Sequence, residues 1–274
     1  MNMLRTTDPT IIDFREKFSL KGKVIIISGA CGLIGRAFCE AVVQFGGNVV
    51  VADIPQAQPE KLAEDLEKRY NIKCIGIPVE VESRSSVIQL KDKTLEVFGK
   101  IDGLVCAHQN KSHLKFEPFE NVCEENWDKV IEVNLKGTFL LCQVIGSYMA
   151  QRGSGSIVTM PSTYSVVAPN QNLYEGTSLG CPAAYSASKG GIDALSRYLA
   201  SYWASKGVRV NMITPHGVWN NHEEQFEKNF SRFSPMRRMS YNHEVAPALI
   251  YLLSDASSYV TGSNMLVEGG WTVW

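Results

Sequence analysis

The chain has 274 residues, a length that allows one large domain or two small ones. Hydrophobic residues make up 45% of it and charged residues 20%, as in an ordinary folded protein, and the formal net charge is −1. This balance provides no basic surplus for a nucleic-acid partner and no acidic excess for a disordered tail.

The N-terminal segment and the cysteines bear on the cellular compartment. Residues 1–20 mix charges of both signs and lack an apolar core of signal-peptide length, so we expect a short N-terminal extension. The seven cysteines form no C-x-x-C pair, and their odd number favours a reducing compartment. Because no apolar run has the length expected of a membrane span, we predict a cytoplasmic protein without membrane contact.

Segments typical of strands and helices alternate along most of the chain. Runs rich in Val and Ile, bounded by Gly, Asp or Pro, predict strands at 23–29, 48–53, 73–81, 101–107, 155–160, 208–214 and 263–270. Helices are predicted between them at 35–45, 58–70, 85–98, 125–151, 183–206 and 242–253. The alternation predicts an α/β fold, a Rossmann-type doubly wound parallel sheet with helices on both faces. Since no Pro/Ser-rich linker divides the chain, 1–274 is expected to be a single domain.

The first predicted strand leads into the first helix through the glycine-rich corner SGACGLIG. Glycines permit a tight turn and let backbone N–H groups approach a pyrophosphate in front of the helix N-terminus. A purely structural turn is the alternative, but the position after the first strand favours a dinucleotide cradle. The candidate cofactor-binding residues of this corner are Ser28, Gly29, Gly32, Leu33, Ile34 and Gly35.

An acidic residue ends the second predicted strand. Asp53 follows Gly35 by 18 residues, close to the spacing expected of the acid that binds an adenosine ribose. A carboxylate there accepts hydrogen bonds from the ribose and repels a 2′-phosphate, so NAD is favoured over NADP. Arg36 could bind that phosphate and is the counter-argument.

The motif YSASK places Tyr185 and Lys189 four residues apart, on one face of a helix. An ammonium beside a phenol favours phenolate and lowers the phenol pKa from about 10 toward neutrality, so that the phenol can exchange a proton with a substrate. With the glycine corner, this motif resembles the short-chain dehydrogenase/reductase family from about residue 20 onward. The resemblance implies that Tyr185 and Lys189 are catalytic and that Lys189 also contacts the cofactor.

Further segments follow the order of that family. The stretch SIVTMPS implies Ser162 as the catalytic serine that fixes the substrate oxygen, and VNLKGTF implies Asn134 as the asparagine of the proton relay. VRVNMITPHGV matches the nicotinamide-binding strand and loop, and PVEVES the adenine side. The resemblance adds these cofactor-binding residues: Glu80, Val81, Cys106, Ala107, Pro215 and Val218.

The sequence also departs from the family pattern. Leu33 occupies the middle glycine slot, and Cys106, Ala107, His108 and Gln109 replace the usual N-N-A-G, so altered binding on the adenosine side is expected. The interval from Ser162 to Tyr185 is longer than usual, which predicts an enlarged active-site loop at 164–182, with a decorative surface loop as the alternative.

Residues 219–239 occupy the place of the family's substrate loop. Phe226, Phe230 and Phe233 recur at helical spacing, which predicts either a small packed helix or a lid that places Trp219, Asn220, Asn221, Arg237 or Arg238 near the substrate. The five histidines show no metal-binding spacing and most are expected at the surface or in loops, although His216 borders the nicotinamide slot. No metal site is predicted.

These features favour an NAD-dependent oxidoreductase that transfers a hydride between the cofactor and an alcohol or ketone of a polar, sugar-like small molecule, with Tyr185 as general acid/base. A nucleotide-sugar epimerase or dehydratase and a non-catalytic dinucleotide-binding regulator remain as alternatives. Family members are often tetramers or dimers, so a homo-oligomer is expected, most simply a homotetramer with the apolar segment 271–274 at a subunit interface.

Overall fold

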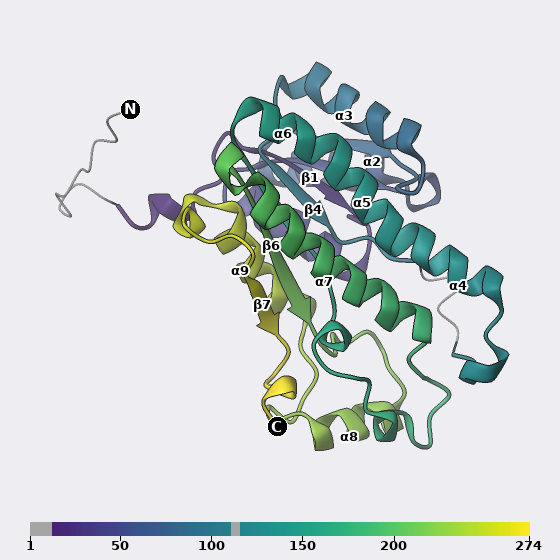
Figure 1. Cartoon of the computed structure of the whole chain (residues 1–274). Coiled ribbons are helices and arrows are strands. Elements are labelled where there is room, and N and C mark those ends of the chain that lie inside the picture. The colour runs from purple at the N-terminus through teal and green to yellow at the C-terminus, as the bar shows by residue number, and fades with distance from the viewer. Residues whose placement is uncertain (1–12, 111–115) are drawn as a thin grey trace.

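The fold was analysed in a computed structural model that describes residues 13–110 and 116–274 (Figure 1). Most of the predicted N-terminal extension, residues 1–12, lies outside the described residues. The strands are β1 Val24–Ser28, β2 Asn48–Asp53, β3 Cys74–Pro78, β4 Gly103–Cys106, β5 Gly155–Thr159, β6 Val208–Pro215 and β7 Asn264–Val267. The helices are α1 Leu33–Gln44, α2 Pro59–Tyr70, α3 Arg84–Phe98, α4 Glu124–Ile131, α5 Gly137–Leu141, α6 Ser147–Arg152, α7 Ala183–Trp203, α8 Glu224–Phe233 and α9 Asn242–Leu253.

The seven strands form one parallel sheet in the order β3-β2-β1-β4-β5-β6-β7, so the predicted doubly wound fold is confirmed. β1 pairs with β2 on one side and with β4 on the other, and the strand order therefore reverses at β1. In open parallel sheets a crevice forms at such a reversal, outside the carboxyl ends of the strands. The glycine corner of 28–35 lies at this place.

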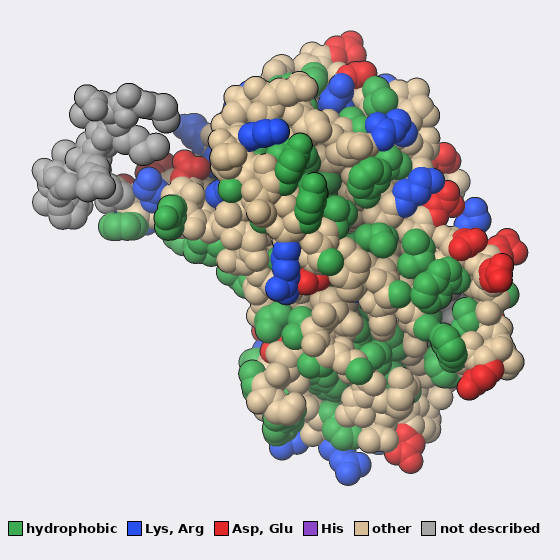
Figure 2. Space-filling view, viewed as in Figure 1, with side chains coloured by type: hydrophobic (Ala, Val, Ile, Leu, Met, Phe, Trp, Pro, Cys, Tyr) green, Lys and Arg blue, Asp and Glu red, His purple; other side chains and the backbone are tan. Residues whose placement is uncertain are grey.

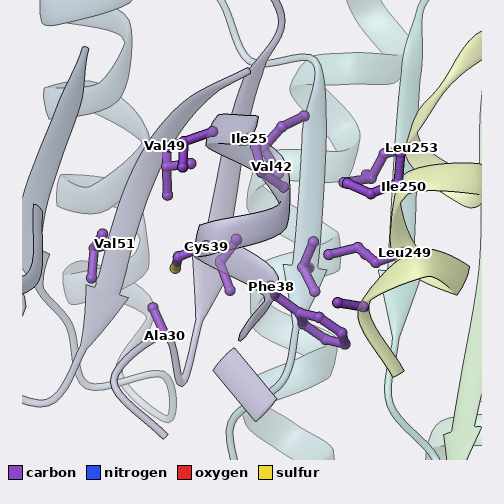
Figure 3. Close-up of a cluster of buried hydrophobic side chains, with 14 of the residues drawn as sticks. Ile25, Ala30, Phe38, Cys39, Val42, Val49, Val51, Leu249, Ile250 and Leu253 are labelled. Atoms are coloured by element: carbon purple, nitrogen blue, oxygen red, sulfur yellow. The ribbon is translucent and has the colours of Figure 1, made fainter. Parts of the chain in front are cut away.

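Helices cover both faces of the sheet, and the strands alternate their side chains between two cores. Ile25 and Ile27 face α1 and α9, where Phe38 and Leu249 are fully buried (Figure 3). Ile26 belongs to the opposite core, formed with α3, α5 and α7. Side chains along a strand alternate between the two faces of the sheet, and helices cover both faces. The strands are therefore apolar on both sides, as expected of a parallel sheet.

The helix predicted at 125–151 is continuous but not regular. Two π-helical turns, Glu132–Lys136 and Cys142–Gly146, separate α4, α5 and α6. The helical segment Glu124–Arg152 contains a window that is long and apolar enough to count as a candidate membrane span by length and composition. By length and composition alone this is weak support for a span. The segment runs beside α7 on one face of the sheet, and half of its most apolar window is buried there (Figure 1).

The two irregular segments predicted at 164–182 and 219–239 pack on each other. The first contains the end of the short helical turn Thr163–Ser165 and a second turn, Gln171–Tyr174, and the second contains α8, the helix indicated by the phenylalanine spacing. Leu173, Phe226, Phe230 and Trp271 form a third, smaller apolar cluster between them. The segment 164–182 is therefore part of a packed wall at the carboxyl edge of the sheet.

Candidate active site

The corner between β1 and α1 has the geometry of a phosphate cradle. Gly29 adopts φ +71°, and a Cβ there would lie 2.6 Å from the His108 Cα atom. A Cβ on Gly35 would overlap the carbonyl oxygen of Gly29, so the corner closes only with glycine at both positions. Gly32 caps α1 and offers no side-chain acceptor, which leaves the amides of Leu33, Ile34 and Gly35 to a ligand or water.

Asp53, the last residue of β2, lies against this corner. Its Oδ2 atom accepts a hydrogen bond from the Cys31 backbone N–H at 2.8 Å, and its Oδ1 atom accepts from the Ile54 N–H at 2.8 Å. The Arg36 Nε atom donates to the Cys31 carbonyl at 3.0 Å, beside the same turn. Sequence spacing alone therefore located the acidic residue next to the cradle.

His108, in the segment expected to alter binding on the adenosine side, is buried beneath the glycine corner, 9% exposed. Its Nδ1 atom lies 2.8 Å from the Ser28 hydroxyl, which also approaches the Val105 carbonyl at 3.2 Å. Burial lowers the pKa of His108 to about 3, so the imidazole is neutral. Ser28 thus anchors His108 under the cradle, a contact that no sequence pattern indicated.

The other predicted cofactor-side residues border the same edge. Cys106 ends β4 and is buried, and the Ala107 N–H donates to the Ser28 carbonyl at 3.1 Å. Val81 is buried against Gly137, whereas Glu80 is exposed. Pro215 ends β6, and the Val218 backbone bridges to Ser240.

Three of the predicted catalytic residues lie close together where β5 ends and α7 begins: Ser162, Tyr185 and Lys189. Ser162 follows β5, and Tyr185 lies in the first turn of α7. Burial raises the pKa of Tyr185, and a hydrogen bond with the Ser162 side chain acts in the opposite direction. Tyr185 as a whole residue is partly exposed.

Lys189 lies one helical turn after Tyr185, with its Nζ atom 5.6 Å from the Tyr185 ring centroid. The Nζ atom donates to the Met160 carbonyl at 2.7 Å, and burial lowers the pKa of Lys189 to about 8. The expected lowering of the Tyr185 pKa by this ammonium is not seen, and burial moves that pKa upward. The reason is that the ammonium is directed to the Met160 carbonyl, while the phenol is desolvated.

Asn134 sits in the first π-helical turn and is fully buried. Its Oδ1 atom accepts from the Asn110 N–H at 2.8 Å, and its Nδ2 atom donates to the Ser188 hydroxyl at 3.1 Å. Ser188 in turn donates to the Tyr185 carbonyl at 2.8 Å. Asn134 therefore links the loop after β4 to the helix that carries Tyr185.

An aromatic cluster surrounds His216, just after β6. Its ring centroid lies 4.3 Å from that of Trp271, 5.1 Å from Phe230 and 5.5 Å from Tyr164. Burial lowers the pKa of His216 to about 4. Trp271 was predicted at a subunit interface, but it folds back on its own chain because this cluster buries its indole, whereas Trp274 stays exposed. Sequence reasoning missed Tyr164 as a neighbour of the site.

The polar residues predicted on a substrate lid are mostly engaged elsewhere. Arg238 forms a bidentate ion pair with Glu244, with both N–O distances 2.7 Å. Arg237 donates to the Arg232 carbonyl at 2.7 Å. The Trp219 indole donates to Glu227 at 2.8 Å. These contacts turn both arginines toward α8 and α9 rather than toward Tyr185.

The glycine corner, its adjoining acid and the fold together define the class of protein. A cradle that excludes any Cβ at Gly29 and Gly35, an uncapped helix N-terminus and a carboxylate at the next strand end fit a dinucleotide. Within 13–110 and 116–274, no group of three or more His, Cys, Asp or Glu side chains could hold a metal ion. The chain has the architecture of a dinucleotide-binding oxidoreductase.

Comparison with known proteins identifies the family. Residues 29–272 match the family model described as enoyl-(acyl carrier protein) reductase. The chain is 32% identical over 270 residues to D-threitol dehydrogenase of Mycolicibacterium smegmatis, covering 96% of each chain. It is 31% identical over 269 residues to NAD-dependent glycerol dehydrogenase of Listeria innocua, covering 96% of this chain and 99% of the other.

The fold matches solved structures over nearly its whole length. A gluconate 5-dehydrogenase from Burkholderia cenocepacia, in complex with NADP and tartrate, aligns with a TM-score of 0.86 at 24% identity, covering 94% of this chain and 98% of the other. The chain belongs to the short-chain dehydrogenase/reductase family, as its motifs predicted. It is an NAD(P)-dependent oxidoreductase.

Proposed function

We propose that this chain is an NAD-dependent polyol dehydrogenase, which interconverts a hydroxyl group and a carbonyl group on a sugar-like substrate. The observation that carries the proposal is the convergence of Ser162, Tyr185 and Lys189 beside a cradle bordered by Asp53. The threitol and glycerol dehydrogenases among the relatives support the polyol class.

The cofactor preference rests on charge. The Asp53 carboxylate is held beside the cradle by the Cys31 and Ile54 amides, and a fixed negative charge there repels a 2′-phosphate. One relative is named as NAD-dependent and one structural neighbour holds NADP, so the acid of this chain is the deciding feature. When bound, the nicotinamide supplies the site that accepts or donates the hydride.

The roles of the chain's own residues follow from their contacts. Tyr185 would exchange the hydroxyl proton of the substrate, and Ser162 would hold the substrate oxygen beside it. Lys189 would stabilise the phenolate form and bind the cofactor ribose. Asn134 would keep α7 in register with the loop after β4 through Ser188. We also propose that the other cofactor-binding residues predicted from the sequence contact the bound dinucleotide.

The test is direct. The purified protein is incubated with NAD or NADP and a panel of polyols, and reduced cofactor is followed by its absorbance. Net NADH production with at least one polyol, and a higher kcat/KM with NAD than with NADP, is expected. An epimerase or dehydratase would convert a nucleotide sugar without net NADH. A regulator would bind the cofactor without turning over any substrate.

We also propose a homo-oligomer that forms through α4–α6 and α7. Hydrophobic side chains gather over these two parallel helices (Figure 2), and Phe139, Tyr198 and Tyr202 are exposed there. Light scattering should give a dimer or tetramer, and Tyr198→Arg should shift the protein toward monomer.

Two further proposals concern the compartment and the domain. We propose the cytoplasm as the compartment, because all seven cysteines are free thiols. We propose one domain as the functional unit, because a single sheet carries the whole site.

A further inference from the structure

Two tyrosines of the segment 164–182 bring their hydroxyl groups together beside Tyr185. The Tyr164 and Tyr174 hydroxyl oxygens lie 2.7 Å apart. The ring of Tyr164 meets the ring of Tyr185 edge-on, with centroids 6.4 Å apart and planes at 84°. A pair of phenols therefore borders the phenol that we assign to proton transfer.

The hydrogen-bonding capacity of this pair is only partly used. Burial raises the pKa of both Tyr164 and Tyr174, so both phenols stay protonated. One of the two O–H groups is spent on the bond between them, which leaves one donor and several lone pairs. Within the described part of the chain, the Tyr164–Tyr174 contact is the hydrogen bond that these hydroxyls make. A group that both donates and accepts, such as an alcohol, matches what remains.

The pair is held in place by α8. The Asn229 side-chain amide donates to the carbonyls of Leu173 at 3.0 Å and Glu175 at 2.9 Å, the two neighbours of Tyr174. The Tyr174 ring packs on Phe226, with centroids 5.9 Å apart. These contacts fix the Tyr174 hydroxyl before any ligand arrives, which reduces the entropy lost on binding.

The surrounding charges disfavour an anionic ligand. His216, whose ring lies 5.5 Å from that of Tyr164, is neutral because burial keeps its pKa at about 4. Glu223 accepts a hydrogen bond from the Ser178 N–H at 3.3 Å and brings a negative charge to the same wall. Arg237 and Arg238 are engaged with other groups. His216 therefore adds no positive charge beside the pair, and the two arginines are directed to other groups.

We propose that the Tyr164–Tyr174 pair recognises a second, uncharged hydroxyl group on the substrate, on a carbon next to the one that is oxidised. The preferred substrates are then neutral diols and polyols, and the corresponding hydroxyketones in reverse, rather than simple alcohols or 2-hydroxy acids. This assignment rests on the proposed dehydrogenase function and identifies two specificity-determining residues for it.

The experiment compares diols with mono-alcohols that lack the second hydroxyl. The pairs are 1,2-propanediol with 2-propanol and 2,3-butanediol with 2-butanol, and lactate serves as the anionic probe. Each is assayed with NAD for the wild type, for Tyr174→Phe and for the control Tyr259→Phe, which removes a hydroxyl from a fully exposed ring. Thermal unfolding of the three proteins checks that the fold is intact.

The wild type should prefer the diol of each pair. Tyr174→Phe should lower kcat/KM for the diol by about three- to tenfold, mainly through KM, since one neutral hydrogen bond is lost. Its effect on the mono-alcohol should stay within about twofold, and Tyr259→Phe should change neither. Equal losses on diol and mono-alcohol, or a preference for 2-propanol or lactate, would overturn the inference. Absence of turnover with every alcohol and polyol would instead refute the proposed function.

Discussion

The backbone N–H of Cys31, inside the glycine corner, donates a 2.8 Å hydrogen bond to the carboxylate of Asp53 at the end of β2. The group that would select the cofactor is therefore also a support of the turn that would cradle its phosphates. Charge and support can be separated by two substitutions, because an amide oxygen still accepts a hydrogen bond but carries no charge.

We expect Asp53→Asn to keep the Cys31 contact and lose the repulsion of a 2′-phosphate. The ratio of kcat/KM with NAD to that with NADP should fall by about tenfold, the effect of roughly 1.4 kcal/mol. Asp53→Ala should also weaken the binding of both cofactors, because the turn loses its acceptor. The measurement is cofactor titration with each variant. A wild type that already uses NADP better than NAD would contradict this role of Asp53.

Tyr185→Phe should retain the fold and cofactor binding and lose turnover. The Tyr185 hydroxyl interacts with the Ser162 side chain, and phenylalanine keeps the ring, so the substitution removes the transferable proton and little packing. General acid–base catalysis contributes roughly 10²–10⁴-fold, and kcat should fall within that range. Cofactor affinity is followed separately by fluorescence of NADH. The assignment fails if kcat of the variant stays near that of the wild type.

Gly35→Ala should abolish dinucleotide binding, because the added methyl group would overlap the carbonyl of Gly29. Gly190 in α7 provides the matched control, since a Cβ there meets nothing within 4 Å. Gly190→Ala should instead raise the free energy of unfolding by up to about 1 kcal/mol, through helix propensity. Calorimetric titration with NADH and thermal unfolding distinguish the two variants. Unchanged NADH affinity in Gly35→Ala would argue against a cradle at this corner.

Acid should destabilise the protein through its buried histidines. Burial lowers the pKa of His108 to about 3 and that of His216 to about 4, whereas an unfolded imidazole titrates near 6.5. As the pH falls below 6.5 the unfolded chain takes up protons that the folded chain does not, so the stability present above pH 6.5 is progressively lost. The loss is about 1.4 kcal/mol per pH unit for each histidine within this window.

The variant His216→Gln tests this dependence. Its Tm should drop less than that of the wild type between pH 7 and pH 5, because one of the two imidazoles is gone. His243→Gln, at an exposed position, should lose as much as the wild type. Equal pH slopes for all three proteins would show that His216 does not contribute.

Much of the fold was predictable because local signals and tertiary structure agree. The run of Val and Ile at 23–29 became β1, whose residues are all buried, and Asn242–Leu253 matches the predicted helix. The approach of Asp53 to the glycine corner followed from the register of neighbouring parallel strands. These features depend on period and spacing, which a sequence displays directly.

What escaped prediction depends on contacts between distant or irregular segments. Tyr164 and Tyr174 lie in a segment without period, so nothing in the sequence indicated that their hydroxyls meet. The apolar character of Trp271 predicted burial but not the surface that buries it, which comes from His216 and Phe230. The burial of His108 reflects its bond to Ser28, 80 residues earlier.

The two π-helical turns at Glu132–Lys136 and Cys142–Gly146 have a consequence for how this chain tolerates changes of length. A π turn holds one residue more than an α turn, so deleting one residue from Glu132–Lys136 would leave an unbroken helix of ordinary α geometry. Because a π turn and an α turn each complete about one rotation, the turns of α4 and α5 on either side would keep their facing relative to α7. Such a deletion would leave the helix folded and change the direction only of side chains in the turn itself, Asn134 among them, so we expect the Asn134–Ser188 contact and the activity to be lost without loss of stability.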